Sequence, residues 1–323
     1  MSRLDRRPLD SSVASGQRSV LVCLPGSVND KSWSEAAARG AEAALHDRVE
    51  YAIVESLAPD FGNWSVVLGH GIGYEKLLSR AASEFPDKTF VVSDDPGLGN
   101  RSEQANISYV DWRWGQATYL GGVLAARLSK SARVGFIAGA PVPTQRRTFS
   151  GFVAGAEATN QDIEVLGTCA GTFEDRGSGK RLAAALLNEG VDVIAHTADI
   201  TGAGAIDAVE EADKIGIGFL NNGERERRVV AGFIESDIGN AIQHILTTVL
   251  SEAETPAVFE FGLGSGFLRF SPNPSLVPAE VISEIESLEN LIAASDSSPG
   301  SHAHQGQAIS TGHDPRILKE QQT

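Results

Sequence analysis

Short apolar runs alternate along the chain with longer stretches whose apolar residues recur at helical spacing. The predicted strands are mostly apolar and span residues 19–24, 49–54, 65–69, 89–93, 106–110, 133–138, 163–168, 191–196, 215–219, 229–234 and 257–261. The predicted helices span 33–47, 74–84, 113–128, 144–159, 176–189, 201–212, 237–252 and 278–294. Strands of this kind are typical of parallel sheets covered on both faces, so the pattern predicts an α/β fold.

The alternation runs through the chain twice, which favours two lobes with a cleft between them. Lobe 1 is expected at 18–129, completed by roughly 236–260, and lobe 2 at 130–235 with part of 261–294. Residues 1–17 form a polar lead. Residues 295–323 are rich in Ser, Gly, His, Gln and Pro, a composition that predicts a disordered tail.

Two connections stand out from the regular pattern. The link 55–64 is too short for a packed crossover helix, since a whole parallel crossover takes about 10 to 12 residues or more. Either the strands on its two sides are not parallel neighbours, or part of the sheet lacks helical cover. Farther along, residues 262–270 contain three glycines and are predicted to form a tight hairpin.

Composition narrows the classes of partner. The 42 acidic and 27 basic residues give a net charge of −15, which argues against nucleic acid, whose binding needs basic patches. Cys23 and Cys169 lie in or beside predicted buried strands, where a free thiol behaves as a small hydrophobe. Apolar runs stay shorter than the roughly 18 residues that span a bilayer. The start as written shows no apolar export signal, so the expected compartment is the cytoplasm.

Candidate recognition chemistry follows the first strand. Asp30 and Trp33 lie between that strand and the next helix, and ligands of open parallel sheets bind beyond the carboxyl ends of the strands. Asp30 can accept hydrogen bonds from a ligand, and Trp33 offers a flat apolar face. The alternative is structural: a helix cap at Ser32 with a packed aromatic behind it.

Enzymatic alternatives have weaker support. Gly69, Gly71 and Gly73 follow a strand, and Asp94 lies at the distance expected for a dinucleotide site, but the spacing is G-x-G-x-G and not G-x-G-x-x-G. Residues 177–180 lack the leading glycine of a phosphate loop. Local sequence suggests neither a Ser-His-Asp nor a Cys-His set.

The histidines do not suggest a metal centre. His70 and His196 lie at strand ends and are expected to line a pocket or pack in the interior. The tail also contains histidines, which are expected to be solvated: His302, His304 and His313. The sequence therefore predicts a protein without catalytic residues, cofactor or bound metal.

Several blocks occur in an order and spacing that resemble those of one family. They are residues 30–33 (DKSW), 69–74 (GHGIGY), 85–92 (FPDKTFVV), 116–123 (QATYLGGV), 134–139 (VGFIAG), 190–194 (GVDVI), 201–204 (TGAG) and 276–281 (LVPAEV). From about residue 18 to 294 the chain resembles the basic membrane protein family, the purine-nucleoside-binding lipoproteins that serve bacterial ABC importers. The resemblance implies two α/β lobes, joined by hinge strands, that close on a ligand.

The resemblance also implies roles for individual residues. Trp33 would stack on a purine, and Asp30 would bind an edge of the base. The remaining residues that the family pattern places near the ligand are Gly71, Tyr74, Asp94, Ala198, Asp199 and Gly202.

Two of the chain's departures from the family pattern fall near the expected ligand. Family members commonly carry an Asp-containing turn for ribose hydroxyls where this chain has Asn221 and Asn222, and a Lys where it has Glu235. The amide groups of Asn221 and Asn222 still donate and accept hydrogen bonds, so we keep both as candidates, and we keep Glu235 with them.

The combined prediction is a non-enzymatic protein that binds a purine nucleoside or base between its lobes, as the solute-binding component of an ABC importer. Its partners would then be a permease and an ATPase, and its compartment periplasmic or membrane-anchored if a leader precedes this start. The alternative is a cytosolic ligand sensor or regulator of the same fold that acts through protein contacts. An NAD-dependent oxidoreductase is the third and weakest interpretation.

Overall fold

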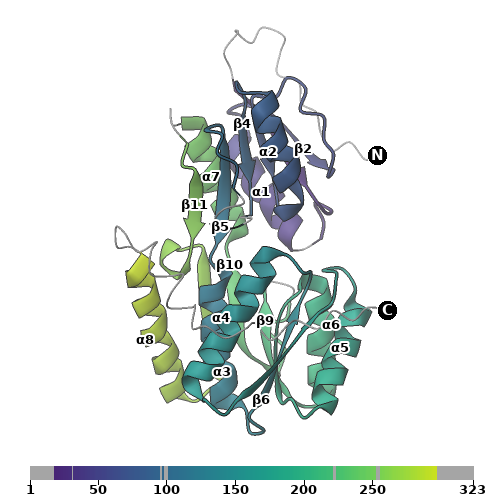
Figure 1. Cartoon of the computed structure of the whole chain (residues 1–323), viewed down its shortest axis with the longest axis vertical. Coiled ribbons are helices and arrows are strands. Elements are labelled where there is room, and N and C mark those ends of the chain that lie inside the picture. The colour runs from purple at the N-terminus through teal and green to yellow at the C-terminus, as the bar shows by residue number, and fades with distance from the viewer. Residues whose placement is uncertain are drawn as a thin grey trace. The chain divides into compact units, whose positions relative to one another are not determined.

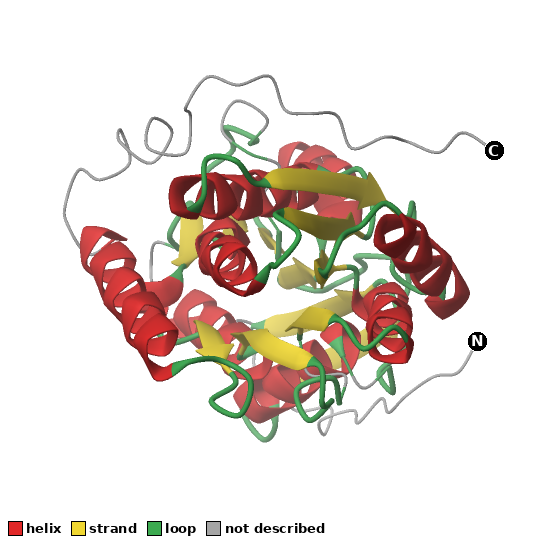
Figure 2. Cartoon of the chain, turned by 90° about the horizontal axis from the view of Figure 1, so that it is seen from below, coloured by secondary structure: helices red, strands yellow, loops and turns green. Residues whose placement is uncertain are grey.

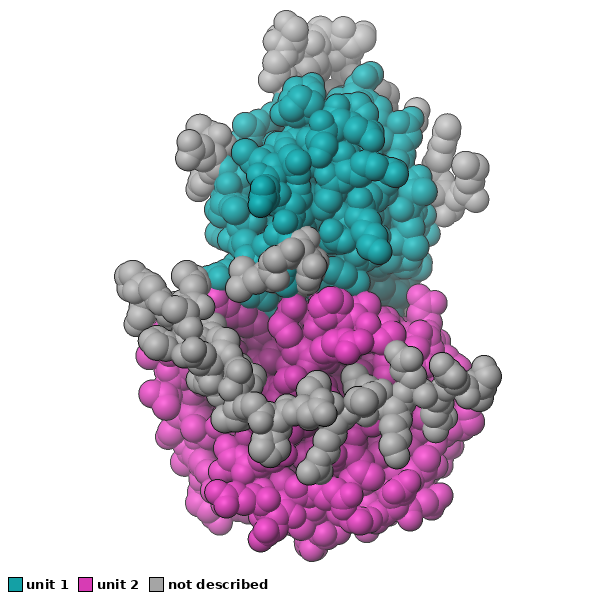
Figure 3. All heavy atoms as spheres, viewed as in Figure 1, with its two compact units in different colours: residues 1–112, 237–261 teal, residues 113–236, 262–323 magenta. Residues whose placement is uncertain are grey.

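The computed structural model describes residues 18–30, 32–94, 97, 101–220, 223–251 and 255–296. They divide into two compact units (Figure 3). Unit 1 contains the described residues of Met1–Trp112 and Asp237–Phe261, and unit 2 those of Arg113–Ser236 and Gly262–Thr323. The predicted polar lead, Asn221, Asn222 and the predicted tail from residue 297 onward lie outside the described residues.

Unit 1 is a parallel sheet with helices packed on it (Figures 1 and 2). Its elements are β1 (Ser19–Leu24), α1 (Trp33–Leu45), β2 (Glu50–Glu55), β3 (Val66–Gly69), the 3₁₀ turn η1 (Ile72–Tyr74), α2 (Glu75–Glu84), β4 (Thr89–Val92), β5 (Ile107–Trp112), α7 (Ile238–Ser251) and β11 (Val258–Phe261). The strand order is β11-β5-β4-β3-β1-β2, and every pairing is parallel. Parallel pairing leaves all carboxyl ends at one edge, where ligands of such sheets bind.

The core of unit 1 is built by apolar residues of α2 against the central strands. Leu78 and Ala82 of α2 pack against Cys23 of β1, Val67 of β3 and Phe90 of β4. α1 and α7 pack on each other, and the approach is close because Gly40 lies against the backbone of α7: a Cβ on Gly40 would come within 2.0 Å of the Gly239 carbonyl oxygen.

The short link after β2 has a structural explanation. β2 and β3 are not neighbours, because each pairs with β1 on opposite sides. The link contains no helix, and Phe61 and Trp64 pack against the unit 1 core in its place. Lys88 fixes the link through its ammonium group, which donates to the Gly62 carbonyl at 3.0 Å and to the Trp64 carbonyl at 2.8 Å.

Unit 2 repeats the layout with one changed edge strand. Its elements are α3 (Trp114–Leu128), β6 (Arg133–Ala138), α4 (Pro143–Thr159), β7 (Glu164–Cys169), α5 (Arg176–Asn188), β8 (Val193–Thr197), α6 (Asp199–Glu211), β9 (Ile215–Phe219), β10 (Val230–Ser236), the 3₁₀ turn η2 (Leu263–Ser265), β12 (Leu268–Pro272) and α8 (Ala279–Asp296). The order β12-β10-β9-β8-β6-β7 matches that of unit 1 position by position, but β12 is antiparallel to β10.

Helices cover both faces of the unit 2 sheet. Successive residues of β6 show this, because neighbouring side chains of a strand point to opposite faces. A Cβ on Gly135 would lie 3.1 Å from Leu186 of α5, whereas the next residue, Phe136, packs against Phe149 and Phe152 of α4. Figure 1 shows α5 beside α6 and α3 beside α4.

The structure confirms the predicted fold class and changes two details. α3, expected in lobe 1, lies in unit 2, where Gly122 packs so tightly on α4 that a Cβ would come within 2.1 Å of the Phe152 carbonyl oxygen. The predicted hairpin at 262–270 is wrong: β11 before it pairs with β5 in one sheet, and β12 after it pairs with β10 in the other. In the part of the chain that the structure describes, no helix is both long and apolar enough to cross a bilayer.

Candidate ligand site

The structure brings the candidates of the N-terminal half to one edge of the unit 1 sheet. β3 pairs with β1 on one side and β4 on the other, with Gly69 opposite both Cys23 and Val92. The segments that follow these three strands, which carry Trp33, His70 and Asp94, therefore begin next to one another. This edge contains the first part of the candidate site.

Asp30 acts as the cap of α1. Its Oδ1 accepts the backbone N–H groups of Ser32 at 2.8 Å and Glu35 at 3.0 Å, and its Oδ2 accepts that of Ser34 at 2.9 Å. Ser32, the residue that the sequence suggests as the cap, makes no side-chain capping hydrogen bond. The structural interpretation of this segment is therefore partly right, but the capping residue is Asp30.

Trp33 is half-buried at the first residue of α1, among other rings. Its ring stacks on that of His70 with centroids 4.1 Å apart and an interplanar angle of 20°. Trp112, at the end of β5, meets it edge-on at 5.9 Å and in turn contacts Phe261, at the end of β11, at 5.1 Å. The indole is thus held at the sheet edge and is not interred in the core.

His70 is a buried histidine, and both of its ring nitrogens are hydrogen-bonded. The imidazole is fully buried, with Nε2 3.1 Å from the Trp33 carbonyl oxygen and Nδ1 2.9 Å from the Ser93 hydroxyl. Because a carbonyl only accepts, Nε2 carries the hydrogen and Nδ1 accepts from Ser93. Burial lowers the pKa of His70 to about 3, against a smaller raising effect of the Trp33 carbonyl and of the Asp30 charge. The ring is therefore neutral near pH 7.

The glycine turn after β3 contributes backbone, while its tyrosine belongs to the core. Gly71 has φ 114°, a conformation that disfavours side chains, and a Cβ there would lie 3.6 Å from the indole nitrogen of Trp33. Tyr74, expected at the ligand, is fully buried, and its hydroxyl donates to the Ser56 carbonyl at 2.8 Å. Burial also raises the pKa of this hydroxyl. We withdraw Tyr74 because its side chain faces the unit 1 core.

Asp94 lies one residue beyond Ser93, the partner of His70, and only 9% of it is exposed. The backbone N–H of Ser93 donates to the Gly69 carbonyl at 2.8 Å, which fixes the end of β4 against the end of β3. Asp94 therefore stays in the candidate site as a buried acidic residue at the carboxyl end of β4, next in sequence to the partner of His70.

In unit 2, two of the expected site residues are packing residues. Ala198 is fully buried in the core cluster under α5 and α6. Gly202 lets α6 pack directly on His196, since a Cβ at this position would come within 1.8 Å of the imidazole Nδ1. Asp199, between them, begins α6 with φ 49° and is half-buried, so it remains a candidate at the carboxyl end of β8.

Sequence reasoning missed a buried pair in unit 2. His196 and Glu224, with 0% and 1% of their side chains exposed, lie 2.8 Å apart through Nε2 and Oε2. Nδ1 accepts the Ala198 N–H at 3.3 Å, so Nε2 donates to the carboxylate. Gly218 makes room for this carboxylate, since a Cβ there would come within 2.8 Å of it. A glycine inside an otherwise apolar strand was the available signal.

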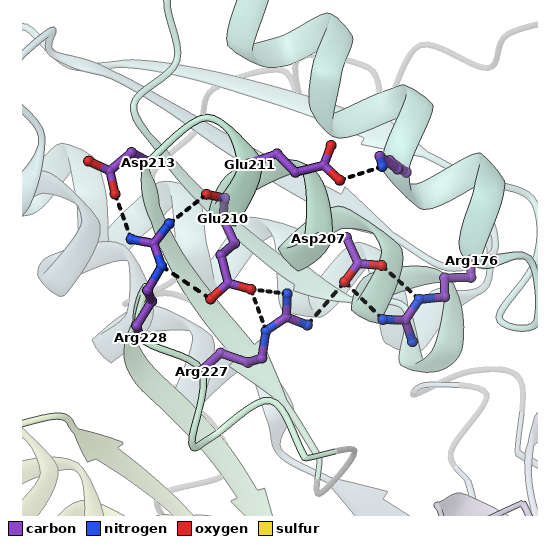
Figure 4. A network of polar contacts seen from close by, with 8 residues as sticks. Arg176, Asp207, Glu210, Glu211, Asp213, Arg227 and Arg228 are labelled. Carbon is purple, nitrogen blue, oxygen red and sulfur yellow. Dashed lines mark hydrogen bonds and ion pairs between the residues drawn. The ribbon is translucent and has the colours of Figure 1, made fainter.

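The segment between Glu224 and β10 is anchored to the surface of unit 2 by ion pairs. Arg227 pairs with Asp207 at 3.0 Å and with Glu210, and Arg228 pairs with Asp213 at 2.7 Å (Figure 4). Burial opposes ionisation of Asp207, but hydrogen bonds from Arg176 and Arg227 outweigh it and hold the pKa of this carboxyl below its usual value. These ion pairs join α5, α6 and the segment before β10.

Glu235, which was expected to replace the family lysine at the ligand, contacts the same segment. Its carboxylate pairs with Arg225 at 2.8 Å and accepts the hydroxyl of Ser271. Glu235 thus ties β10 to the preceding segment and to β12, and we withdraw it from the site. Asn221 and Asn222 lie outside the described residues.

Metal binding has no visible basis in the described part of the chain. Groups of three or more His, Cys, Asp or Glu side chains placed to hold an ion are absent from these residues. Cys23 and Cys169 are both buried free thiols, and burial raises the pKa of Cys23 to about 12.

Comparison with known proteins gives the family. Residues 17–299 match the profile described as ABC transporter substrate-binding protein PnrA-like. Basic membrane protein A of Borreliella afzelii is 28% identical over 300 residues, covering 87% of this chain and 91% of that protein. The ABC transporter nucleoside-binding protein of Lactococcus lactis is 27% identical over 276 residues, covering 77% of this chain and 76% of that protein.

The fold is also that of solved solute-binding proteins. The crystal structure of an ABC transporter solute-binding protein from Aeropyrum pernix superposes with a TM-score of 0.73 at 21% identity, covering 88% of this chain and 95% of that one. With the match to the family profile, which spans most of the sequence, this places the fold among periplasmic-binding-protein-like solute receptors. The chain belongs to the PnrA-like family of ABC transporter substrate-binding proteins, and it is a non-enzymatic solute-binding protein.

Proposed function

We propose that this chain binds a purine nucleoside or a free purine base as the solute-binding component of an ABC importer. The observation that carries the proposal is the half-buried Trp33 indole, fixed at the carboxyl edge of the unit 1 sheet by His70 and Trp112. The nucleoside-binding relative from Lactococcus lactis supports the same ligand class. A permease and an ATPase are the partners that this role requires.

A purine suits this edge physically. It is a flat, nearly neutral heterocycle, and stacking on an aromatic side chain contributes about 1 to 3 kcal/mol per base. Selectivity then comes from hydrogen bonds to the base edges and the sugar. Asp94, buried at the carboxyl end of β4, is the acceptor that we assign to the ligand.

Asp30 keeps a smaller role at the ligand. An ionised carboxylate has about four lone-pair sites, and three backbone N–H groups of this chain already occupy them in part. Its main contribution to binding is therefore to fix the first turn of α1, and with it the orientation of Trp33. In unit 2 we assign Asp199 to the ligand, and Asn221 and Asn222 stay predictions. The position of the ligand between the lobes also stays a prediction.

Calorimetry tests the proposal directly. We expect heat of binding with adenosine, guanosine or inosine, or with the corresponding bases, and none with uridine or ribose at equal concentration. A failure of all purines to bind up to millimolar concentration would remove the ligand class but leave the fold intact. Comparing each nucleoside with its base shows whether the sugar contributes to affinity.

A further inference from the structure

We propose that His70 is a positioning residue for Trp33: its imidazole covers one face of the indole and holds the Trp33 backbone, so that a planar ligand stacks on the other face. The inference rests on the proposed function, because it names the residue through which the stacking platform is oriented. His70 lies immediately after β3 and contacts Trp33, the first residue of α1.

Two separate contacts join His70 to Trp33. The rings stack at 4.1 Å and 20°, which fixes the plane of the indole. The Nε2–H group donates to the Trp33 carbonyl at 3.1 Å, which fixes the backbone from which the indole projects. Because one residue restrains both plane and backbone, the indole keeps its orientation without a ligand, and the entropic cost of ordering it falls on folding and not on binding.

The neighbours of His70 keep it in the required state. The Ser93 hydroxyl donates to Nδ1 at 2.9 Å and so selects the tautomer that carries its hydrogen on Nε2. Asp30 is the charged group whose field acts on the ring, and burial outweighs that field. A neutral imidazole offers the indole an aromatic face without a net charge. The support therefore stays the same over the whole range from weakly acidic to alkaline pH.

Unit 2 offers an internal comparison. β8 occupies the place in its sheet that β3 occupies in unit 1, and it carries His196, which is also fully buried and which aligns in strand register with Gly69, one residue before His70. His196 pairs with a carboxylate, whereas His70 pairs with a carbonyl, a hydroxyl and an aromatic ring. The surroundings of His70 are those of a support for an aromatic side chain.

A double-mutant cycle with adenosine as the probe tests the inference. In His70→Gln the amide can still donate to the Trp33 carbonyl, but the stacked ring is lost. We expect this change to weaken adenosine binding by about two- to tenfold, the range of one aromatic pair. In a Trp33→Ala background the same change should leave the affinity within about twofold, because His70 acts through the indole. An equal loss in both backgrounds, or no loss in either, would overturn the inference.

Two further measurements separate this inference from the ligand proposal and from loss of folding. Val91→Ala, a fully buried change in the neighbouring strand β4, controls for general destabilisation and should leave adenosine affinity unchanged. In the ligand-free protein, nitrogen NMR should show His70 neutral with hydrogen on Nε2 from pH 5 to 8, and His70→Gln should shift the Trp33 indole resonance more than that of Trp64. If adenosine fails to bind, the proposed function falls, and these resonances alone decide the role of His70. Titration of His70 in that range, or an unmoved Trp33 resonance, would contradict it.

Discussion

At the residue scale, the sequence identified Trp33 correctly as a residue at the sheet edge but could not name what holds it. The family pattern and the position after β1 point to the indole. His70 and Trp112 are brought to it, and Phe261 to Trp112, only by the order of strands. Tyr74 and Gly202 show the opposite error. Both belong to motifs of the family pattern, yet one fills the core and the other permits close helix packing.

The first prediction concerns Trp33 itself. Trp33→Ala should weaken adenosine binding by about 1 to 3 kcal/mol, the contribution of one stacked base, and Trp33→Phe should retain most of the affinity. Calorimetry measures both. Trp64→Phe, in the link that packs on the unit 1 core, is the matched aromatic control and should bind adenosine with the affinity of the wild-type protein. Equal affinity for Trp33→Ala and the natural chain would move the platform elsewhere.

At the element scale, the predicted strands and helices agree with the structure to within a few residues at their ends, because short apolar runs alternate with longer stretches of helical spacing. The exceptions are connections. Residues 262–270 contain the glycines of a hairpin, but the pairing partners of β11 and β12 are set by strands distant in sequence. The ion pairs of residues 225–228 were equally hidden, because their partners lie on α6, just after it at Asp213, and on β10.

A prediction at this scale concerns the cap of α1. Asp30→Ala should lower the free energy of unfolding by about 0.5 to 2 kcal/mol, because three backbone N–H groups at the start of the helix lose their acceptor. Asp30→Asn should recover most of the loss, since Asn is also a good capping residue. Urea denaturation measures the difference. An unchanged free energy of unfolding in Asp30→Ala would show that the carboxylate serves the ligand and not the helix.

The packing of α1 on α7 yields a paired prediction. Gly40→Ala should destabilise unit 1 by about 1 to 3 kcal/mol, because its Cβ meets the Gly239 carbonyl at 2.0 Å. Gly239→Ala is the control: its Cβ has 3.4 Å to the nearest atom, and alanine favours a helix. Thermal unfolding should therefore show a lower Tm for the first variant only. Similar Tm values for the two variants would contradict the close approach of the helices.

At the scale of the whole molecule, the two halves share one strand order, as the repeated alternation predicted. The boundary between the units lies after β5, whereas the sequence predicted it after residue 129. It is earlier because α3 packs on α4, a tertiary contact that the local sequence pattern does not show. The family follows from the match of residues 17–299, while the ligand rests on fewer residues. Composition argues against nucleic acid as a partner more strongly than it selects a solute.

The ion pairs of unit 2 make stability depend on pH in a defined direction. The pKa of the Asp207 carboxyl is lowered in the folded state, so the unfolded chain binds its proton first as pH falls. Its stabilising contribution is complete above about pH 4, the usual carboxyl value, and is lost as pH drops through the lowered pKa. Urea denaturation of Asp207→Asn should show a shallower loss of stability below pH 4 than the natural chain. Asp162→Asn, an exposed carboxylate outside this network, should leave the slope unchanged.

The most direct test of the central claim is a crystal structure of the protein with adenosine bound. We expect the purine ring to lie parallel to the Trp33 indole, in van der Waals contact with the face turned away from His70, with Asp94 accepting a hydrogen bond from the ligand. A purine bound out of contact with Trp33, or an indole flipped away from His70 in the complex, would contradict the account.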